Sequence, residues 1–404
     1  MKQSFQKTSA NPFAKRGLPA LNWVVVVCMV LLLIGGIFFI RSASAMRTGT
    51  VRLLHLRMLY NWVPLGLLLH VLVARANYRK WNDWSWVFYA VGVFMLLLLF
   101  VPGLGTERMG ARRWLFGFQP SEFAKFSVVP MLAFILSGSS LRKGPIKFLL
   151  AILASAVPAI LIALQPDLGT ALPLVPAGLA MAYVSGCAPR TLMAVCLAGL
   201  LLTGAFFAAV LLPEKLPPEP RARVEQVVDT VIFPHWKKRI LVFVYPERDP
   251  LGAGWNKRQS EIAVGSGGLH GKGYLKGTQN ILGFLPRAVS STDFIFSVIG
   301  EEKGFYGSAV LLALFAGLLG GIAVTGLTCR DEVGRLICTG VAALLFTHIF
   351  VNVAMTIGKM PITGIPLPLV SYGGSFTLST LALLGLVQSI AIHGRKPISG
   401  ASGS

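Results

Sequence analysis

The sequence predicts an all-α, polytopic integral membrane protein with about ten transmembrane helices and one large extracytoplasmic loop. Of its 404 residues, 54% are hydrophobic and 13% are charged, and the mean hydropathy is +0.68. A soluble domain carries roughly 25% charged residues, so this composition indicates a membrane protein. The apolar runs are also long enough, because about 20 helical residues cross a bilayer. We expect residues 1–404 to form a single transmembrane domain.

Ten apolar stretches fit this length. The first follows a polar, basic lead and lacks a small-residue cleavage pattern, so we expect a retained span rather than a signal peptide. Asn61 and His70 interrupt the second, and only Gln165-Pro166-Asp167 separates the fifth from the sixth, so one broken unit is an alternative there. The expected spans are Asn22–Ile40, Met58–Ala74, Trp84–Val101, Glu122–Leu136, Ile146–Leu164, Leu168–Ser185, Leu192–Leu212, Phe294–Thr325, Leu336–Ile357 and Phe376–Ile392.

The basic residues predict the orientation. An even number of spans places both termini on one side, together with short basic loops such as Arg75/Arg79/Lys80 and Arg330/Arg335. The positive-inside rule makes this side the cytoplasm. Residues 1–21 and 393–404 are then cytoplasmic tails, and residues 213–292 lie outside the cytoplasmic (inner) membrane.

The polar segment 213–292 carries an unusual charge for the outer face. It holds twelve Lys or Arg against seven Asp or Glu, a net charge of +5. A solvated loop near anionic lipid headgroups explains this charge, and so does a site for a strongly anionic substrate, because Arg and Lys bind phosphate. Much of the basic charge of a membrane protein is expected on its loops, so the charge does not indicate nucleic acid.

Four polar clusters, each broken by glycine or proline, are predicted on this same face. They are Gly105–Lys125, Gln165–Thr170, the polar segment 213–292 together with Asp293, Glu301 and Glu302, and Gly358–Ser375. Irregular backbone at membrane depth is tolerated only where protein or a water-filled cavity satisfies its polar groups. Any one cluster is explained by packing or by a local ion pair, but four on one face predict a functional site.

Asp293 is the acid that we expect to matter most. We place it in the first turn of the apolar helix that follows the glycine-rich polar segment. An ionisable group at such a junction is a functional-site hypothesis by default. The alternative is a helix-capping acid, which stabilises a helix start by about 0.5–2 kcal/mol.

At these residues the chain resembles the SEDS family (shape, elongation, division and sporulation). The resemblance runs from about Gly103 to the end of the last span and rests on GARRW, FQPSE, QPDLGT, DPLGAGW, GSGGL, TDFIF and GIPLPLVSYGGS. It implies a peptidoglycan glycosyltransferase that polymerises lipid II outside the membrane. The GKG…GTQ and GIPLPLVSYGGS forms favour the elongation branch over the division-specific branch. Ten spans and a broken helix would also suit a lipid-linked precursor flippase, and a non-catalytic scaffold is a further competing interpretation.

The resemblance also implies partners and roles for single residues. The partners would be a class B penicillin-binding protein (transpeptidase), other elongation-complex proteins and membrane lipid. The family's essential acid falls at Asp293, although the His that usually precedes Thr-Asp is Ser291 here. The substrate-binding candidates are Arg239, Lys237, Lys238, Arg112, Arg113, Glu122, Lys125, Asp167, Ser371, Tyr372, Gly373 and Gly374.

The chemistry of glycan extension fits these residues. A sugar hydroxyl that attacks an anomeric carbon needs a base, which Asp293 would supply. The departing pyrophosphate needs cations, which the Arg and Lys residues would supply. A single displacement inverts the anomeric centre. The sequence shows no closed set of acidic metal ligands, so no cofactor is assigned and a bound divalent cation stays an open alternative.

Overall fold

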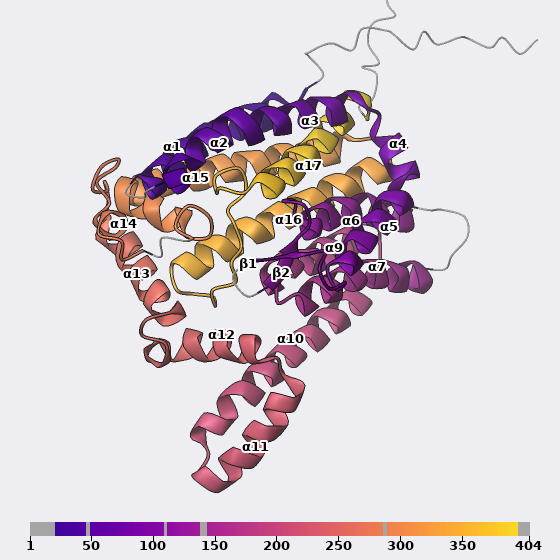
Figure 1. The fold of residues 1–404 in the computed structure, drawn as a ribbon. Coiled ribbons are helices and arrows are strands. Elements are labelled where there is room, and N and C mark those ends of the chain that lie inside the picture. The colour runs from indigo at the N-terminus through magenta and orange to yellow at the C-terminus, as the bar shows by residue number, and fades with distance from the viewer. Residues whose placement is uncertain (1–20, 46–48, 109–110, 138–143, 286–288, 395–404) are drawn as a thin grey trace, which may run out of the picture.

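The computed structural model describes residues 21–45, 49–108, 111–137, 144–285 and 289–394. Figure 1 shows long helices packed into one bundle, from which α10 and α11 project. The helices and strands are α1 (Trp23–Ser44), η2 (Gly49–Leu53), α2 (Leu54–Arg57), the π-helix η3 (Met58–Trp62), α3 (Val63–Arg75), α4 (Tyr78–Asp83), α5 (Ser85–Leu98), β1 (Thr106–Arg108), β2 (Ala111–Trp114), α6 (Pro120–Ser137), α7 (Gly144–Leu164), α8 (Leu168–Ala171), α9 (Leu174–Val184), α10 (Pro189–Leu211), η4 (Leu212–Lys215), α11 (Pro218–Val231), α12 (Pro234–Val244), η5 (Pro246–Arg248), α13 (Ala253–Ser266), α14 (Thr278–Ile281), α15 (Ile295–Thr328), α16 (Glu332–Thr356) and α17 (Gly374–His393).

All ten stretches predicted as spans are largely helical. Seven helices in the described part of the chain are long and apolar enough to cross a membrane. The other three predicted spans correspond to α5, α6 and the α8–α9 pair, which are shorter or, in α6, carry charge. The fifth and sixth spans are separate helices, because α7 and α9 pack against each other. The fold is therefore a polytopic all-helical membrane protein.

Burial separates the centre of the bundle from its edge. In their most apolar windows, 83% of the α17 residues are buried and 67% of the α16 residues, against 6% in α10. A helix that is apolar all round is either buried or faces lipid. Helices α16 and α17 therefore form the centre of the bundle. Helix α10 lies at its edge and exposes most of its apolar surface to the membrane.

The segment 213–292, predicted as a loop, consists largely of helices within its described residues. Prolines occupy the first positions of α11 and α12, where the missing N–H costs nothing and the fixed φ angle favours a helix start. After α13, the chain turns through Gly268 and Gly271, both with positive φ. The glycines and charges thus mark the ends and the surfaces of helices rather than a continuous loop.

The over-long span predicted at Phe294–Thr325 is divided in the structure. Helix α15 extends over 34 residues, but Gly304 has φ 63° and ψ −157°, which is not helical. A Cβ atom there would lie 2.4 Å from the backbone nitrogen of Gly271, so only glycine fits. A short segment before Gly304 therefore precedes the membrane-crossing part of α15.

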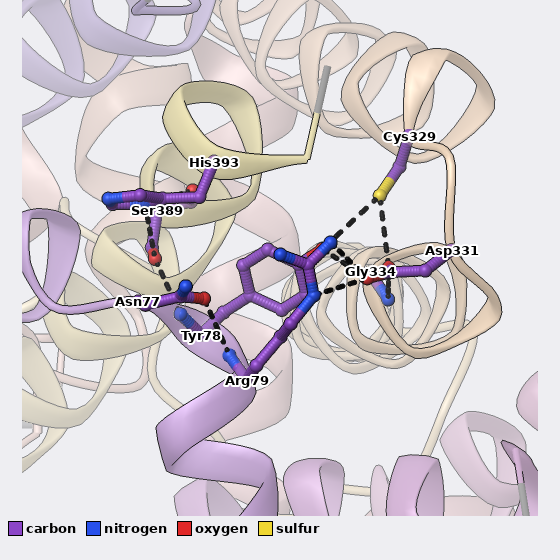
Figure 2. A network of polar contacts seen from close by, with 8 residues as sticks. All are labelled: Asn77, Tyr78, Arg79, Cys329, Asp331, Gly334, Ser389 and His393. Carbon is purple, nitrogen blue, oxygen red and sulfur yellow. Dashed lines mark hydrogen bonds and ion pairs between the residues drawn. The ribbon is translucent and has the colours of Figure 1, made fainter. Parts of the chain in front are cut away.

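Polar contacts tie together one end of the bundle. The Asn22 backbone N–H donates to Gln388 at 2.9 Å, and the Arg330 N–H donates to the Gly394 carbonyl at 3.1 Å. The start of α1, the α15–α16 link and the end of α17 therefore meet. Figure 2 shows the network at this end, where the Asp331 carboxylate accepts from Tyr78 at 2.5 Å and from Arg79 at 3.0 Å. Asp331 also caps α16 by accepting from the Gly334 N–H at 2.9 Å.

We expect Asp331→Ala to destabilise the protein by about 2–3 kcal/mol, since it removes a helix cap and leaves the Tyr78 hydroxyl without its acceptor. Burial raises the pKa of Asp331, but hydrogen bonds from Tyr78 and Gly334 lower it on balance, so the carboxylate is ionised at neutral pH. Thermal unfolding in detergent measures the effect, with Glu332→Gln as the neighbouring control. Equal melting temperatures for the two variants would contradict this role.

Candidate active site

Asp293 lies two residues before α15, not in its first turn as predicted. The N-cap of α15 is Phe294, no side chain caps the helix, and its first turn contains no acid. The structure therefore gives no support to the capping alternative. The backbone at Asp293 is fixed by Asn352, whose Nδ2 donates to the Asp293 carbonyl at 2.8 Å and to the Ile365 carbonyl at 2.6 Å.

The electrostatic surroundings of Asp293 define a charged cluster outside the spans. Burial raises the pKa of Asp293 to about 6, helped by the negative charge of Asp167. The Thr292 hydroxyl and the guanidinium groups of Arg239 and Arg113 act in the opposite direction. A carboxylate with a pKa near neutrality is suited to accept a proton, because it is ionised at pH 7 and still basic.

Arg113 and Asp167 form one side of the cluster. The Arg113 guanidinium donates to the Pro166 carbonyl at 2.6 Å and the Gln165 carbonyl at 3.2 Å, and its Nη1 lies 3.8 Å from Asp167 Oδ2. Asp167 also accepts from Gln119 Nε2 at 3.3 Å and from the Thr170 N–H at 3.2 Å. The QPDLGT motif therefore folds around the arginine, and its backbone bonds hold the guanidinium in place.

The β1–β2 hairpin separates the two adjacent arginines. Neighbouring residues of a strand point to opposite faces. Arg112 pairs with Glu107 at 3.9 Å, and both side chains are more than half exposed. Arg113 faces the cluster with Asp293 and Asp167, and Arg112 is not placed there.

Helix α12 contributes Arg239 to the other side of the cluster. Its Nη1 donates to the Thr363 carbonyl at 3.3 Å, and burial together with the nearby charge of Arg113 lowers its pKa. The two lysines before it are paired elsewhere. Lys237 binds Asp229 at 2.7 Å and Lys238 binds Asp249 at 3.1 Å. Of these three predicted cations, the structure brings only Arg239 to Asp293.

The loop between α16 and α17 is bound to the backbone beside Asp293. The Ser371 hydroxyl donates to the Thr292 carbonyl at 2.5 Å, and the Tyr372 N–H donates to the Ser291 carbonyl at 2.8 Å. Gly373 precedes α17, and Gly374 begins it against the ring of Trp62, which a Cβ would approach to 2.4 Å. Of these four predicted residues, Ser371 and Tyr372 therefore position the backbone next to the acid, whereas Gly374 packs against Trp62.

Glu122 and Lys125 form a buried ion pair inside the bundle. Their atoms Oε1 and Nζ lie 2.8 Å apart, and each residue is only 2% exposed. Glu122 also accepts from the Ser379 hydroxyl of α17 at 3.0 Å, and Lys125 contacts His348 Nε2 of α16 at 3.2 Å. The pair joins three core helices and does not contribute to the Asp293 cluster.

The acidic side chains near Asp293 do not form a complete set of metal ligands among the described residues. In the described parts of the chain, no group of three or more His, Cys, Asp or Glu residues is placed to hold a metal ion. Asp293 and Asp167 supply two nearby carboxylates. A divalent cation held here would take further ligands from substrate phosphates and water, as Mg²⁺ often does.

Several residues of the site were not singled out from the sequence. Gln119 and Asn352 hold Asp167 and the Asp293 backbone, as described above. A polar residue within an apolar stretch is a signal that would have identified Asn352. His235 lies near Arg239 and Arg113, whose charges add to burial in lowering its pKa, and its buried Nε2 has no hydrogen-bond partner within the described residues. No local pattern marked His235.

The helices and this site define a class: a polytopic membrane protein with a partly buried acid and two arginines at one end of its bundle. The chain belongs to the FtsW/RodA/SpoVE family, because the model of this family, described as cell cycle protein, matches residues 22–396. Peptidoglycan glycosyltransferase MrdB of Escherichia coli (strain K12) is 35% identical over 342 residues, which cover 83% of this chain and 85% of that protein.

Solved structures agree with this assignment. A chain from a study of how a peptidoglycan synthase complex coordinates polymerization and crosslinking matches with a TM-score of 0.72 and 29% identity, covering 92% of this chain and 98% of that one. The Rod shape determining protein RodA of Thermus thermophilus matches with a TM-score of 0.64 and 28% identity, covering 92% and 97%.

Proposed function

We infer that this chain is a peptidoglycan glycosyltransferase that polymerises lipid II during cell elongation. The names of its relatives support the activity, and the rod-shape relative supports elongation over division. The observation that carries the proposal is the position of Asp293, a partly buried acid beside the arginines Arg113 and Arg239.

The cluster can perform each part of a glycosyl transfer. The ionised Asp293 carboxylate accepts the proton of the acceptor's 4-hydroxyl while that oxygen forms a bond to the donor's anomeric carbon. The bond from this carbon to pyrophosphate breaks, and the pyrophosphate leaves with the electron pair. Arg113 and Arg239 stabilise the charge that develops on it. One displacement inverts the anomeric configuration.

The reaction would take place on the outer face of the cytoplasmic membrane. The end of the bundle opposite Asp293 holds Arg79, Lys80 and Arg330, which the positive-inside rule places in the cytoplasm. Both termini would then be cytoplasmic, and the 213–292 segment would face outward.

A labelling experiment tests this orientation. We expect Thr230→Cys, at an exposed position of α11, to react with a membrane-impermeant maleimide in intact cells or spheroplasts. Lys80→Cys, exposed on α4, should react only after lysis. Both variants are made with Cys196, the exposed native cysteine, replaced by Ala. The opposite pattern would invert the topology.

The similarity to a synthase complex that also crosslinks supports a partner. We propose a class B penicillin-binding protein, which would crosslink the strands that this chain extends. The purified chain, with and without that partner, is supplied with lipid II, and glycan strands are separated by length. We expect glycan strands to form in reactions that contain this chain and not in reactions that contain the partner alone. Translocation of lipid II without polymer would favour a flippase instead.

Arg239→Ala is expected to lower kcat/KM for lipid II by about 10- to 100-fold, because the leaving pyrophosphate loses a cation. The side chain lies in a polar site and, among the described residues, donates one hydrogen bond, to the Thr363 carbonyl, so the change in stability should be small. Arg258→Ala, on the exposed face of α13, is the matched control. Equal kinetics for both variants would remove Arg239 from the mechanism.

A further inference from the structure

A polar cavity lies at the same end of the bundle as Asp293. Its volume is about 430 Å³, and it opens between the end of α1, the η2–α2 segment, α14 and α15. The Asn280 side chain donates to the Ser42 carbonyl at 2.8 Å, and the Ser290 hydroxyl donates to the Ala43 carbonyl at 3.4 Å. These bonds connect the cavity wall to the chain just before Asp293.

The lining of this cavity is basic and open to an anion. Arg41, Arg52 and His55 contribute to it, and the two arginines are exposed. Neither arginine forms an ion pair with an acid that the structure describes. The one acid in the lining, Glu302, is 1% exposed, and its Oε1 accepts a hydrogen bond from the Ser42 hydroxyl, while its buried Oε2 has no hydrogen-bond partner among the described residues.

The depth of the cavity matches lipid headgroups. Arg41 lies in the last turn of α1, and Arg52 lies in the first turn of the second apolar span, Val51–Arg75. Both guanidinium groups are therefore at the membrane–water boundary. Guanidinium groups at this depth bind the phosphates of lipids.

The cavity is separate from the arginines beside Asp293. Arg113 and Arg239 come from β2 and α12, whereas α1 and α14 form this cavity on another side of the same end (Figure 1). Glu302 lies nine residues after Asp293, and the helical part of this stretch, from Ile295 to Glu302, rises about 10 Å at 1.5 Å per residue. That spacing is on the scale of a disaccharide.

Polymerisation of a lipid-linked sugar requires two pyrophosphates at once. One leaves the donor and must lie beside Asp293. The other stays on the acceptor, separated from the attacking hydroxyl by the acceptor's own disaccharide. We propose that the Arg41–Arg52 cavity binds the pyrophosphate of the acceptor lipid, an inference that rests on the proposed function.

Binding without turnover tests the proposal. The probe is undecaprenyl pyrophosphate, which carries no sugar, and native mass spectrometry in detergent counts the molecules bound to each chain. We expect two on the wild-type protein, one on Arg41→Gln/Arg52→Gln and one on Arg113→Gln/Arg239→Gln. Arg57→Gln, on the exposed face of α2 and outside the lining, should keep two. Affinity at the lost site is expected to fall more than tenfold.

Further variants and a competing lipid distinguish a specific pyrophosphate site from a general phospholipid site and from unfolding of the variant. Arg41→Lys/Arg52→Lys should retain the second molecule, and the single Arg52→Gln variant repeats the test if the double variant unfolds. Two molecules on a folded Arg41→Gln/Arg52→Gln protein would overturn the proposal. Equal displacement of the second molecule by phosphatidylglycerol would also overturn it, since the cavity would then be a general phospholipid site. A wild-type chain that binds two molecules but never polymerises lipid II would contradict the proposed function and not this site.

Discussion

Asp293→Asn is expected to lower glycan polymerisation by at least about 100-fold, because an amide cannot accept the proton of the attacking hydroxyl. The substitution keeps the size of the side chain. The backbone bonds of Asn352 and Ser371 do not depend on the carboxylate, so the site should keep its shape. Initial rates with purified protein and lipid II measure the effect.

The stability of the same variant separates a base from a structural acid. The pKa of Asp293 is about 6 in the folded protein, above its ordinary value of 3.8, so the folded state binds more protons between these pH values. Stability is therefore lost as the pH rises through this window. We expect Asp293→Asn to be more stable by about 1–3 kcal/mol at pH 8, with the gain shrinking toward pH 4. An inactive variant that is also less stable at pH 8 would contradict this account.

Lys125→Met is expected to destabilise the protein by about 3–5 kcal/mol, because it leaves the buried Glu122 carboxylate without its partner. The double variant Glu122→Gln/Lys125→Met removes both charges and should recover most of this loss. Thermal unfolding in detergent measures both. The outcome matters for function, since both residues were predicted to bind substrate and the structure places them in the core.

The control for this experiment is Arg258→Met, which breaks a 3.7 Å contact between two exposed side chains, Arg258 and Glu247. That pair should contribute less than about 1 kcal/mol. If Lys125→Met melts like the control and yet loses activity, Lys125 acts on substrate rather than in packing.

The helices were predictable because each apolar run has the length of a span and little charge. The helices within segment 213–292 were not predicted. Its charge and its glycines indicated a loop, and the prolines that begin α11 and α12 were not interpreted as helix starts. Among the candidate site residues, motif content indicated Asp293, Arg239 and Asp167. Which of several adjacent cations reaches the acid depends on tertiary packing, since successive residues of a helix point about 100° apart.

The i,i+3 spacing of Glu122 and Lys125 was a readable signal for an ion pair. The family motif led instead to a prediction of substrate binding for both residues. The Arg41–Arg52 cavity was not predictable from the sequence, because Asn280 and Glu302 are far from the two arginines in the chain and share no pattern with them.

The pH dependence of kcat/KM, measured with lipid II on the wild-type protein and on Asp293→Asn, shows whether Asp293 is the catalytic base. This parameter reports the ionisation of the free enzyme. For a base with a pKa of about 6, the wild-type value should be level above pH 7 and fall toward tenfold per unit below pH 6. The variant should show a small residual rate without this acidic limb. A variant that retains wild-type activity, or the same limb, would contradict the assignment of Asp293 as the base.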